Sequence, residues 1–352
     1  MNNNIYMDLH VIQTVPPSNI NRDDTGSPKT AKYGGVTRAR VSSQSWKKAM
    51  RDYFKKYSDK DTLGIRTLKI VHYLAEAIME EEQSIEEEDA LKLAEEIFKK
   101  VKISTKNQEA RALFFLGGEQ RKQLASYGVE HADNLQVGEI KNILNANQSI
   151  DVALFGRMVA DAPDLNVDAS SQVAHSISTH EIETEFDFFT AIDDLTPDDQ
   201  SGAGMLGTVE YNSSTLYRYA NVAIHELNQQ LDSNKEVVIE ALKLFIKAFA
   251  LSIPSGKINT FANQTLPNAL VVTLRQDRPV NLVNAFESPV KAKNGYVEGS
   301  ISKFKEEYEK TNRFIEAPLA TFSTGDIEGL GQGIGSLNEL LAAFEESANK
   351  LL

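Results

Sequence analysis

The sequence predicts an α+β protein whose fold is interrupted by a helical subdomain and by a protruding β-hairpin. Strand-like runs occur in the first fifty residues and again beyond residue 180, while residues 58–150 have a helical pattern and are poor in glycine and proline. Two strand-like runs also enclose a turn at 196–207 that is rich in Pro, Asp, Ser and Gly. The 352 residues are roughly two to three times the usual size of one domain, so the chain has room for such insertions.

The first two elements are strands. Residues 8–14 alternate in polarity and stop at Val15-Pro16-Pro17, because proline lacks the amide hydrogen that a sheet requires. Residues 36–41 alternate as well, which places Arg38 and Arg40 on the same face of a second strand.

The next element is a strongly amphipathic helix. Ser42 and Ser43 are favourable N-cap residues, and the apolar residues that follow recur with helical spacing as far as Tyr57. Three cations spaced by four residues form a line that we expect on its exposed side: Lys47, Arg51 and Lys55. A helix N-terminus beside a basic line favours phosphate as the ligand.

The remaining elements follow from the same patterns. In the helical subdomain we expect helices at 62–82, 84–101, 107–116 and 137–146, then a buried strand at 151–158. Beyond it we expect hairpin strands at 182–194 and 208–219, a helix at 233–251, a strand at 269–274, a helix at 304–313 and a last helix after Ser336. Capping boxes predict three of the helix starts, with these pairs: Ser84 and Glu87, Ser233 and Glu236, Ser336 and Glu339.

Charge is distributed unevenly along the chain. The formal net charge is -13, yet residues 29–56 contain nine Lys or Arg against one acid. Residues 80–96 contain nine acids and one lysine, and residues 183–199 contain seven acids and no base. This pattern indicates one cationic surface that can bind a polyanion, with acidic surfaces that are either solvated or meet a basic partner.

The sequence lacks the common catalytic patterns. There is no cysteine, which excludes disulfides, a thiol nucleophile and thiolate metal sites. The spacing of His175 and His180 favours ordinary packing over a metal site, and Asp193 with Asp194 fits a solvated hairpin better than a Mg²⁺ site. The glycines at 329–335 form no phosphate-binding motif. We therefore expect a protein that is not an enzyme and has no cofactor or metal.

No apolar run approaches the length of a membrane span, and the first residues do not form a signal peptide. We expect a cytoplasmic protein without a membrane partner.

The strongest constellation combines cations, hydroxyls and a helix N-terminus, the groups that position a nucleic-acid backbone without reading its bases. Its members are Arg22, Lys29, Arg38, Arg40, Ser42, Ser43, Gln44, Lys47, Lys48 and Arg51. Lys291 and Lys293 form a second basic point. Candidate stacking residues are Met158, Phe186, Phe188 and Phe189, although core packing is the commoner role for any one of them.

These residues resemble a known family. The runs Asn21-Arg22-Asp23-Asp24, Gly34-Gly35 and Arg40-Val-Ser-Ser-Gln-Ser-Trp-Lys-Lys-Ala-Met-Arg51 are similar to the N-terminal signature of CasC, the crRNA-binding backbone subunit of the type I-E CRISPR Cascade complex. Further matches follow in family order, and residues 58–150 and the last forty or so are the least similar. They are Gly156-Arg157-Met158, Ala174-His-Ser-Ile-Ser-Thr-His180, Phe189-Thr-Ala-Ile-Asp-Asp-Leu195, Tyr217-Arg-Tyr-Ala-Asn221, Asn284-Ala-Phe286 and Val290-Lys-Ala-Lys-Asn-Gly295.

The resemblance implies a hand-like protein with a modified RRM (ferredoxin-like) palm, helical fingers and a thumb hairpin. The implied division is palm at 1–57 with the basic helix at 43–57, fingers at 58–172, palm at 173–184, thumb at 185–215 and palm at 216–352. It further implies copies stacked head to tail along crRNA in a filament, with the guide bases presented to target DNA and with other Cascade subunits as partners. Sequence would then be read by base pairing, and the protein would contact the backbone.

The resemblance also implies roles for single residues. The residues that correspond to backbone contacts are Arg22, Lys29, Ser42, Gln44, Lys47, Arg51, Lys291 and Lys293, and we add Arg40, Ser43 and Lys48 from the same segment. Met158 corresponds to a base-wedging residue of the fingers, and Phe189 and Thr190 to those of the thumb. The loop after Met158 is more acidic than the family pattern, and the palm lacks the aromatic motif of ordinary RRMs.

Two other functions remain open from the sequence. One is a metal-dependent ribonuclease backbone subunit that uses Asp193 or Asp194. The other is an interaction scaffold that works without RNA and whose basic surface meets an acidic partner.

Overall fold

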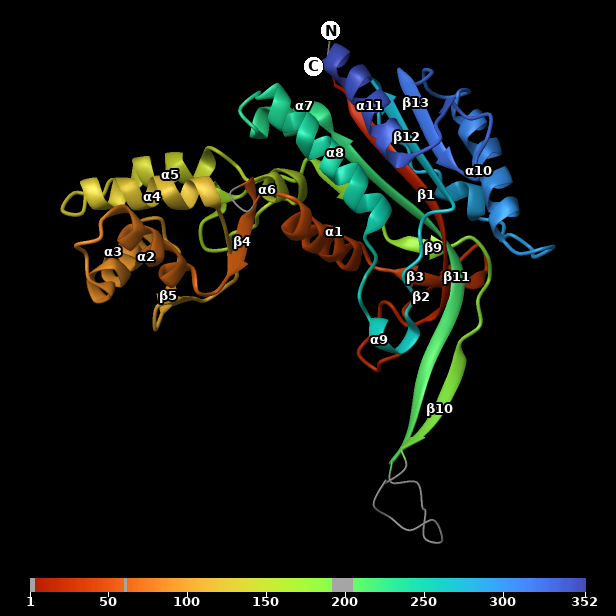
Figure 1. The fold of residues 1–352 in the computed structure, drawn as a ribbon, viewed down its shortest axis with the longest axis horizontal. Helices are drawn as coiled ribbons and strands as arrows, with labels where there is room; N and C mark the ends of the chain where they lie inside the picture. The colour runs from red at the N-terminus through yellow and green to blue at the C-terminus, as the bar shows by residue number, and fades with distance from the viewer. Residues whose placement is uncertain (1–3, 60–61, 192–204) are drawn as a thin grey trace.

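The computed structural model describes residues 4–59, 62–191 and 205–352. Figure 1 shows a body built on a twisted sheet, a helical lobe to one side and a long hairpin that projects below the body. The large sheet has the strand order β14-β13-β12-β1-β11-β9-β3-β2, and β8 and β10 also pair with β11. The predicted α+β class is confirmed by this mixed architecture.

Long strands form the centre of the sheet. β1 (Tyr6–Ser18) lies between β11 (Met205–Ala223) and β12 (Ala269–Arg275), antiparallel to both. The ladder between β1 and β11 shifts register between Val15 and Ser18, where the two prolines cannot donate hydrogen bonds. The other strands of this sheet are β2 (Thr30–Tyr33), β3 (Val36–Val41), β8 (Ser171–Val173), β9 (Ser176–Ser178), β10 (Glu185–Ala191), β13 (Ala320–Gly325) and β14 (Gln332–Gly333).

Helices cover both faces of the sheet. On one face, α1 (Ser43–Tyr57), α8 (Lys235–Leu251) and α11 (Leu337–Leu351) bury Trp46, Phe245 and Phe344 in the main core, with the short α7 (Ile224–Gln230) nearby. On the other face, α10 (Val297–Thr311) and the 3-10 turn η4 (Val283–Phe286) bury Phe286 and Phe304 against β1, β11 and β12. α9 (Ile258–Phe261) lies in the connection from α8 to β12.

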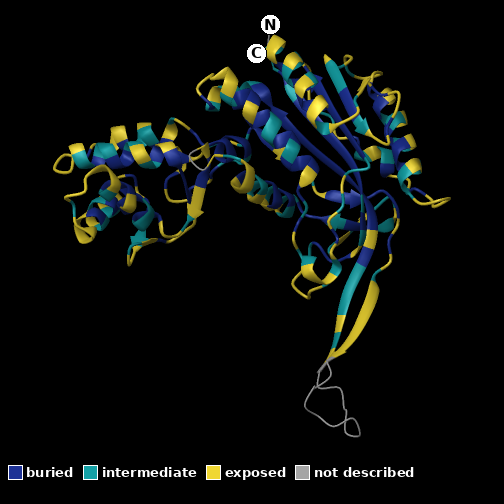
Figure 2. Cartoon of the chain, in the orientation of Figure 1, coloured by how far each residue is buried: buried dark blue, intermediate teal, exposed yellow. Residues whose placement is uncertain are grey.

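The helical lobe has a core of its own. It consists of α2 (Ile70–Glu81), α3 (Glu87–Lys100), α4 (Gly118–Glu130) and α5 (Val137–Asn145), and the 3-10 turn η2 (Pro163–Leu165) adds Leu165 to it. α6 (Ile150–Phe155) packs instead into the main core of the body. Two small antiparallel pairs complete it, β4 (Gly64–Thr67) with β7 (Phe114–Gly117) and β5 (Thr105–Lys106) with β6 (Glu109–Ala110). Figure 2 shows that buried residues concentrate in the lobe and the body, whereas the projecting hairpin is largely exposed.

Several sequence predictions for the lobe are wrong. The expected helix at 107–116 is replaced by β6 and β7, because Asn107 and Gln108 adopt positive φ in the tight turn after β5. The expected strand at 151–158 is instead the short helix α6, which ends at Gly156 with φ of 79°. A short apolar run gives no period that separates the two structures. The helix expected at 62–82 is divided, with β4 preceding α2.

The capping predictions had mixed outcomes. Ser42 and Ser336 are N-caps, each accepting a hydrogen bond from a backbone amide three residues later. Ser84 is not a cap, since α3 begins after Glu86. Ser233 has φ of 56°, and Asn234 takes the N-cap role at α8 by accepting from the Val237 amide. Within the described residues, no helix combines the length and the apolar character needed to cross a membrane.

Candidate nucleic-acid interface

The N-terminus of α1 is fixed by two side chains. The Ser42 hydroxyl accepts from the Ser45 amide at 3.3 Å, and the Ser42 amide donates to Asn21 Oδ1 at 2.8 Å. Trp46 donates from its ring nitrogen to Ser176 Oγ at 2.9 Å, which ties the first turn to β9. The first turn contains no acid, so its backbone amides form an uncompensated positive end.

An open groove of about 480 Å³ lies beside this helix end. The loop around Arg22, the α1 residues Ser45 and Lys48, and residues 253–256 line the groove. Lys48 forms an exposed ion pair of 2.6 Å with Asp52, which also lines it. The exposed Arg22 is therefore the cation of this groove that has no carboxylate partner among the described residues.

The basic line on α1 is less exposed than the sequence predicts. Lys47 and Arg51 are half-buried, because Lys47 Nζ lies 5.8 Å from the ring centre of Phe155 on α6, and the Arg51 guanidinium 5.3 Å from that of Phe115 on β7. Neither is within 4 Å of a described carboxylate oxygen. Burial lowers the pKa of Lys47, with Arg51 adding to the effect.

These two cations mark the junction between the body and the helical lobe. Burial lowers the pKa of Arg51 as well, and the next cause is the nearby cation Arg66 on β4. Arg66 was not among the predicted contact residues, because β4 lies inside a segment whose sequence pattern is typical of one continuous helix. Asp151 and Asp52 act on the pKa of Arg51 in the opposite direction but form no ion pair with it among the described residues. Cations that lack ion-pair partners at a junction of two subdomains can contact a polyanion running between them.

A second group of cations lies at the edge of the sheet. Arg40 donates from Nε to the Thr30 carbonyl at 3.1 Å, and its Nη1 is 3.2 Å from His175 Nδ1. A guanidinium only donates, so Nδ1 accepts and the imidazole proton resides on Nε2. Burial lowers the pKa of His175, with Arg40 and Lys29 contributing further. Lys29 is therefore close enough to act on the same ring.

Arg38 lies apart from this group, although the sequence places it on the same strand face as Arg40. It is fully buried and donates to the carbonyls of Ser178 at 3.0 Å and Phe286 at 2.8 Å. Its guanidinium connects two segments of the body, so Arg38 stabilises the fold and offers no surface charge.

The remaining predicted contact residues differ in exposure. Gln44 lies on the open side of α1, and Ser43 is half-buried at its first position. Lys291 and Lys293 lie in the exposed loop before α10, whose start is anchored by the Val290 amide donating to the Thr179 carbonyl at 2.9 Å. A hydrogen bond to Asn21 connects Ser42 with the loop that contains Arg22, and Lys29 lies beside Arg40. Lys291 and Lys293 lie on a separate segment.

Met158 is presented rigidly. Its side chain is 83% exposed, while its neighbour Arg157 is buried and donates to the carbonyls of Leu165 and Leu144, both at 2.9 Å. The backbones of Arg157 and Val167 exchange two hydrogen bonds of 2.9 Å, and the Val159 amide donates to Asn166. The loop thus exposes a large apolar side chain on a backbone that is fixed on both sides.

The hairpin presents different side chains on its two faces. Phe189 pairs with Gly207, and Thr190 with Leu206, so the two predicted thumb residues point to opposite faces. Phe186, Phe188 and Leu206 share a face with Thr190 and are 65%, 65% and 61% exposed, against 39% for Phe189. A protruding surface of this kind is typical of a binding site for another molecule.

The described residues contain no cluster of three or more His, Asp or Glu side chains arranged for a metal ion. His175 is exposed beside Arg40, whereas His180 is buried. Asp193 and Asp194 lie outside the described residues. The glycines at 329–335 connect β13 with α11, through the two-residue strand β14.

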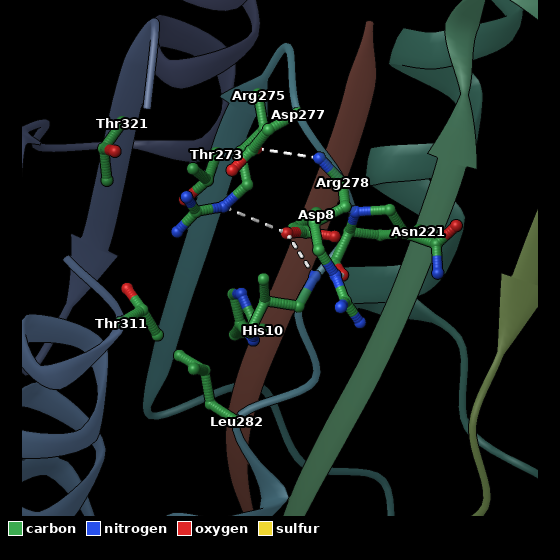
Figure 3. Close-up of polar contacts among 12 residues, drawn as sticks. Asp8, His10, Asn221, Thr273, Arg275, Asp277, Arg278, Leu282, Thr311 and Thr321 are labelled. Carbon is green, nitrogen blue, oxygen red and sulfur yellow. Dashed lines mark hydrogen bonds and ion pairs between the residues drawn. The ribbon is translucent and has the colours of Figure 1, made fainter. Parts of the chain in front are cut away.

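A buried polar cluster lies on the α10 face of the sheet (Figure 3). Asp8 accepts from the Tyr219 hydroxyl at 2.7 Å and the Val280 amide at 3.1 Å, and Arg275 Nε is 3.3 Å away. Burial raises the pKa of Asp8 to about 7 against these donors. The cluster fixes the segment after β12 to the sheet and has no surface opening, since Asp8 and Arg275 are at most 1% exposed.

Three comparisons with known proteins place the chain. The model of the family described as CT1975-like protein (Cas_CT1975) matches residues 7–341. A chain from a solved structure titled "CRISPR RNA-guided surveillance complex, pre-nicking" is 31% identical with a TM-score of 0.86, covering 97% of this chain and 100% of its own. A chain from a second "CRISPR RNA-guided surveillance complex" is 27% identical with a TM-score of 0.75, covering 97% of this chain and 99% of its own. No curated protein matches. The chain belongs to the CT1975-like family.

Proposed function

We propose that this protein is a non-catalytic Cascade subunit that binds the backbone of crRNA, of the CasC kind found in type I-E complexes. The observation that carries the proposal is the pair Lys47 and Arg51 on α1, which lies at the junction of the body and the helical lobe and forms no ion pair among the described residues. The similarity to chains of RNA-guided surveillance complexes supports the same function. Residues 1–57, 173–184 and 216–352 would form an RRM-like palm, residues 58–172 the fingers and 185–215 the thumb.

The backbone contacts would come from three groups on this surface. The α1 end contributes Arg22, Ser42, Ser43, Gln44, Lys47, Lys48 and Arg51, the sheet edge Lys29 and Arg40, and the loop before α10 Lys291 and Lys293. Amides, hydroxyls and cations of this kind fix the path of a phosphate backbone without reading bases. Met158, Phe189 and Thr190 would wedge against bases, so that the free bases pair with target DNA.

Copies would associate head to tail along the RNA, together with other Cascade subunits. Phe186, Phe188 and Leu206 support a contact with a further copy, because these large apolar side chains of the hairpin are more than half exposed in the described chain. A heterologous contact of this type propagates a filament, so the bound RNA and capping subunits would limit its length.

The test is co-expression with a CRISPR array and the partner subunits, followed by extraction and sequencing of the nucleic acid that co-purifies. Guide RNA of uniform length is the expected result. Protein that assembles without RNA would favour the interaction scaffold and overturn the proposal. Cleavage of complementary RNA that disappears with EDTA would favour the metal-dependent ribonuclease.

A further inference from the structure

The segment Ser178–His180 connects four elements of the body. Ser178 accepts from the Ala39 amide through its hydroxyl and from Arg38 through its carbonyl, both at 3.0 Å. Thr179 donates from its amide to the Thr215 carbonyl at 2.8 Å, and accepts from the Val290 amide at 2.9 Å and the Ser300 hydroxyl at 2.8 Å. The segment therefore links β3, β11, the loop before α10, and α10 itself.

His180 contacts residues on both sides of this segment, Thr215 on β11 and Tyr296 before α10. Its Nε2 accepts from the Thr215 amide at 3.0 Å, and its Nδ1 is 2.7 Å from the Glu181 carbonyl. An amide only donates and a carbonyl only accepts, so the proton lies on Nδ1 and the ring is neutral. The ring also stacks on Tyr296 with a centroid distance of 3.6 Å and an interplanar angle of 8°.

These contacts place His180 between two functional segments. Thr215 lies on β11, the strand that continues into the projecting hairpin, and residue 181 leads into its other strand, β10. Tyr296 immediately precedes α10, and it follows the loop that contains Lys291 and Lys293. One buried ring thus joins the base of the hairpin to the end of the basic loop.

We propose that His180 is a positioning residue, which fixes the direction of the hairpin relative to the loop of Lys291 and Lys293. This inference rests on the proposed function, because the hairpin and the loop would contact the same RNA there. Long hairpins are mobile unless their base is fixed, and a wedge must meet the RNA at a constant distance from the backbone contacts.

The surroundings of His180 keep the ring neutral. Burial lowers its pKa, the Glu181 carbonyl works in the opposite direction, and the buried guanidinium of Arg38 lowers the pKa further. The other groups that face it are the ring of Tyr296 and the amide of Thr215, neither of which carries charge. A protonated ring would lose the hydrogen bond from Thr215, so the coupling depends on the neutral form.

The absence of cysteine allows a direct test on the full chain. Thr208→Cys on the hairpin and Asn294→Cys in the loop, both exposed positions, accept spin labels without background labelling. Pulsed electron paramagnetic resonance then gives the distribution of distances between the two spin labels. We expect a narrow distribution in the parent, broader ones in His180→Asn and Tyr296→Leu, and a narrower one again in His180→Gln, whose amide oxygen reaches the Nε2 position.

His225→Asn is the matched control, because His225 is half-buried on α7, and its hydrogen bond and ring contact within the described residues are with the Ile5 carbonyl and the Tyr6 ring, far in sequence from the hairpin and the basic loop. Its distribution should equal that of the parent. If His180→Asn does not fold, Tyr296→Leu carries the test alone, since it removes the stack and leaves the His180 hydrogen bonds. Parent-like widths in the folded variants would overturn the inference.

A second measurement connects the geometry to RNA. Chemical probing of RNA bound to the parent should show reactive nucleotides at a regular interval, where bases are displaced. Tyr296→Leu should bind within about twofold of the parent but lose this regularity, whereas equal loss of affinity and regularity would contradict a positioning role. If the parent binds no RNA, the proposed function fails, while the distance measurement still decides the role of His180.

Discussion

Phe189 and Gly207 face each other across the hairpin, and the ring of Phe189 fills the space above the glycine. A Cβ atom at position 207 would lie 2.3 Å from Phe189 Cζ, so no side chain fits there. An aromatic ring over a cross-strand glycine shields the backbone and fixes the ring direction. The wedge proposed for this hairpin is therefore held in one orientation before any RNA binds.

Met158→Ala and Phe189→Ala should impair capture of target DNA more than binding of crRNA. Both side chains are exposed, so truncation should change the free energy of unfolding by less than about 0.5 kcal/mol for Met158 and little more for Phe189. Competition binding with labelled RNA and with target duplex measures the two steps separately. Phe314→Ala, at an 87% exposed phenylalanine after α10 to which no RNA contact is assigned, is the matched control, and an equal loss in both assays for the two wedge variants would contradict the wedge role.

Lys47→Ala combined with Arg51→Ala should weaken RNA binding about equally for all sequences. Each lost phosphate contact reduces the slope of log affinity against log salt by about 0.7 for a single strand, so the pair should reduce it by about 1.4. Lys55→Ala with Lys56→Ala removes the same charge from the exposed end of α1 and controls for net charge. An unchanged slope in the first variant would exclude α1 from the interface.

Gly34→Ala should destabilise the body much more than Gly35→Ala. Both residues have positive φ, which costs an alanine about 1 kcal/mol, but a Cβ at 34 would lie 1.6 Å from the Glu287 carbonyl oxygen and a Cβ at 35 meets nothing within 4 Å. The overlap forces the turn away from the segment leading to Lys291, at a further cost of about 2 kcal/mol. Denaturant unfolding measures the difference, and equal losses would show that the two segments are not packed together.

Features that depend on neighbouring residues alone were predicted correctly from the sequence. The strand at 36–41, the Ser42 cap and the Ser336 cap are confirmed, because alternation and capping are local properties. The half-buried state of Lys47 and Arg51 was not predictable, since their partners Phe155 and Phe115 are over sixty residues away in sequence. Arg66 was missed for a related reason, because a four-residue strand gives too short a pattern to separate from the helix that follows it.

Acidification should destabilise the protein through His10. Burial lowers the pKa of His10 to about 3, with Arg275 as the second cause, while the unfolded residue takes up its proton near 6.5. Between these values the unfolded state binds more protons, so stability falls as pH falls. Each unit of pKa difference corresponds to about 1.4 kcal/mol, and the full shift therefore to roughly 5 kcal/mol.

His10→Asn isolates this effect. The Tyr217 hydroxyl accepts from the Leu282 amide and lies 2.9 Å from His10 Nδ1, and an asparagine amide at position 10 can donate to this hydroxyl or accept from it without titrating. Asp8, whose pKa is raised to about 7, titrates in both proteins and works in the opposite direction, because a raised carboxyl pKa removes stability as pH rises from 3.8. The difference in unfolding free energy between the two proteins therefore reports His10. As the pH falls from 6.5 toward 4, we expect the parent to lose more unfolding free energy than His10→Asn does. A difference independent of pH would refute a neutral, buried His10.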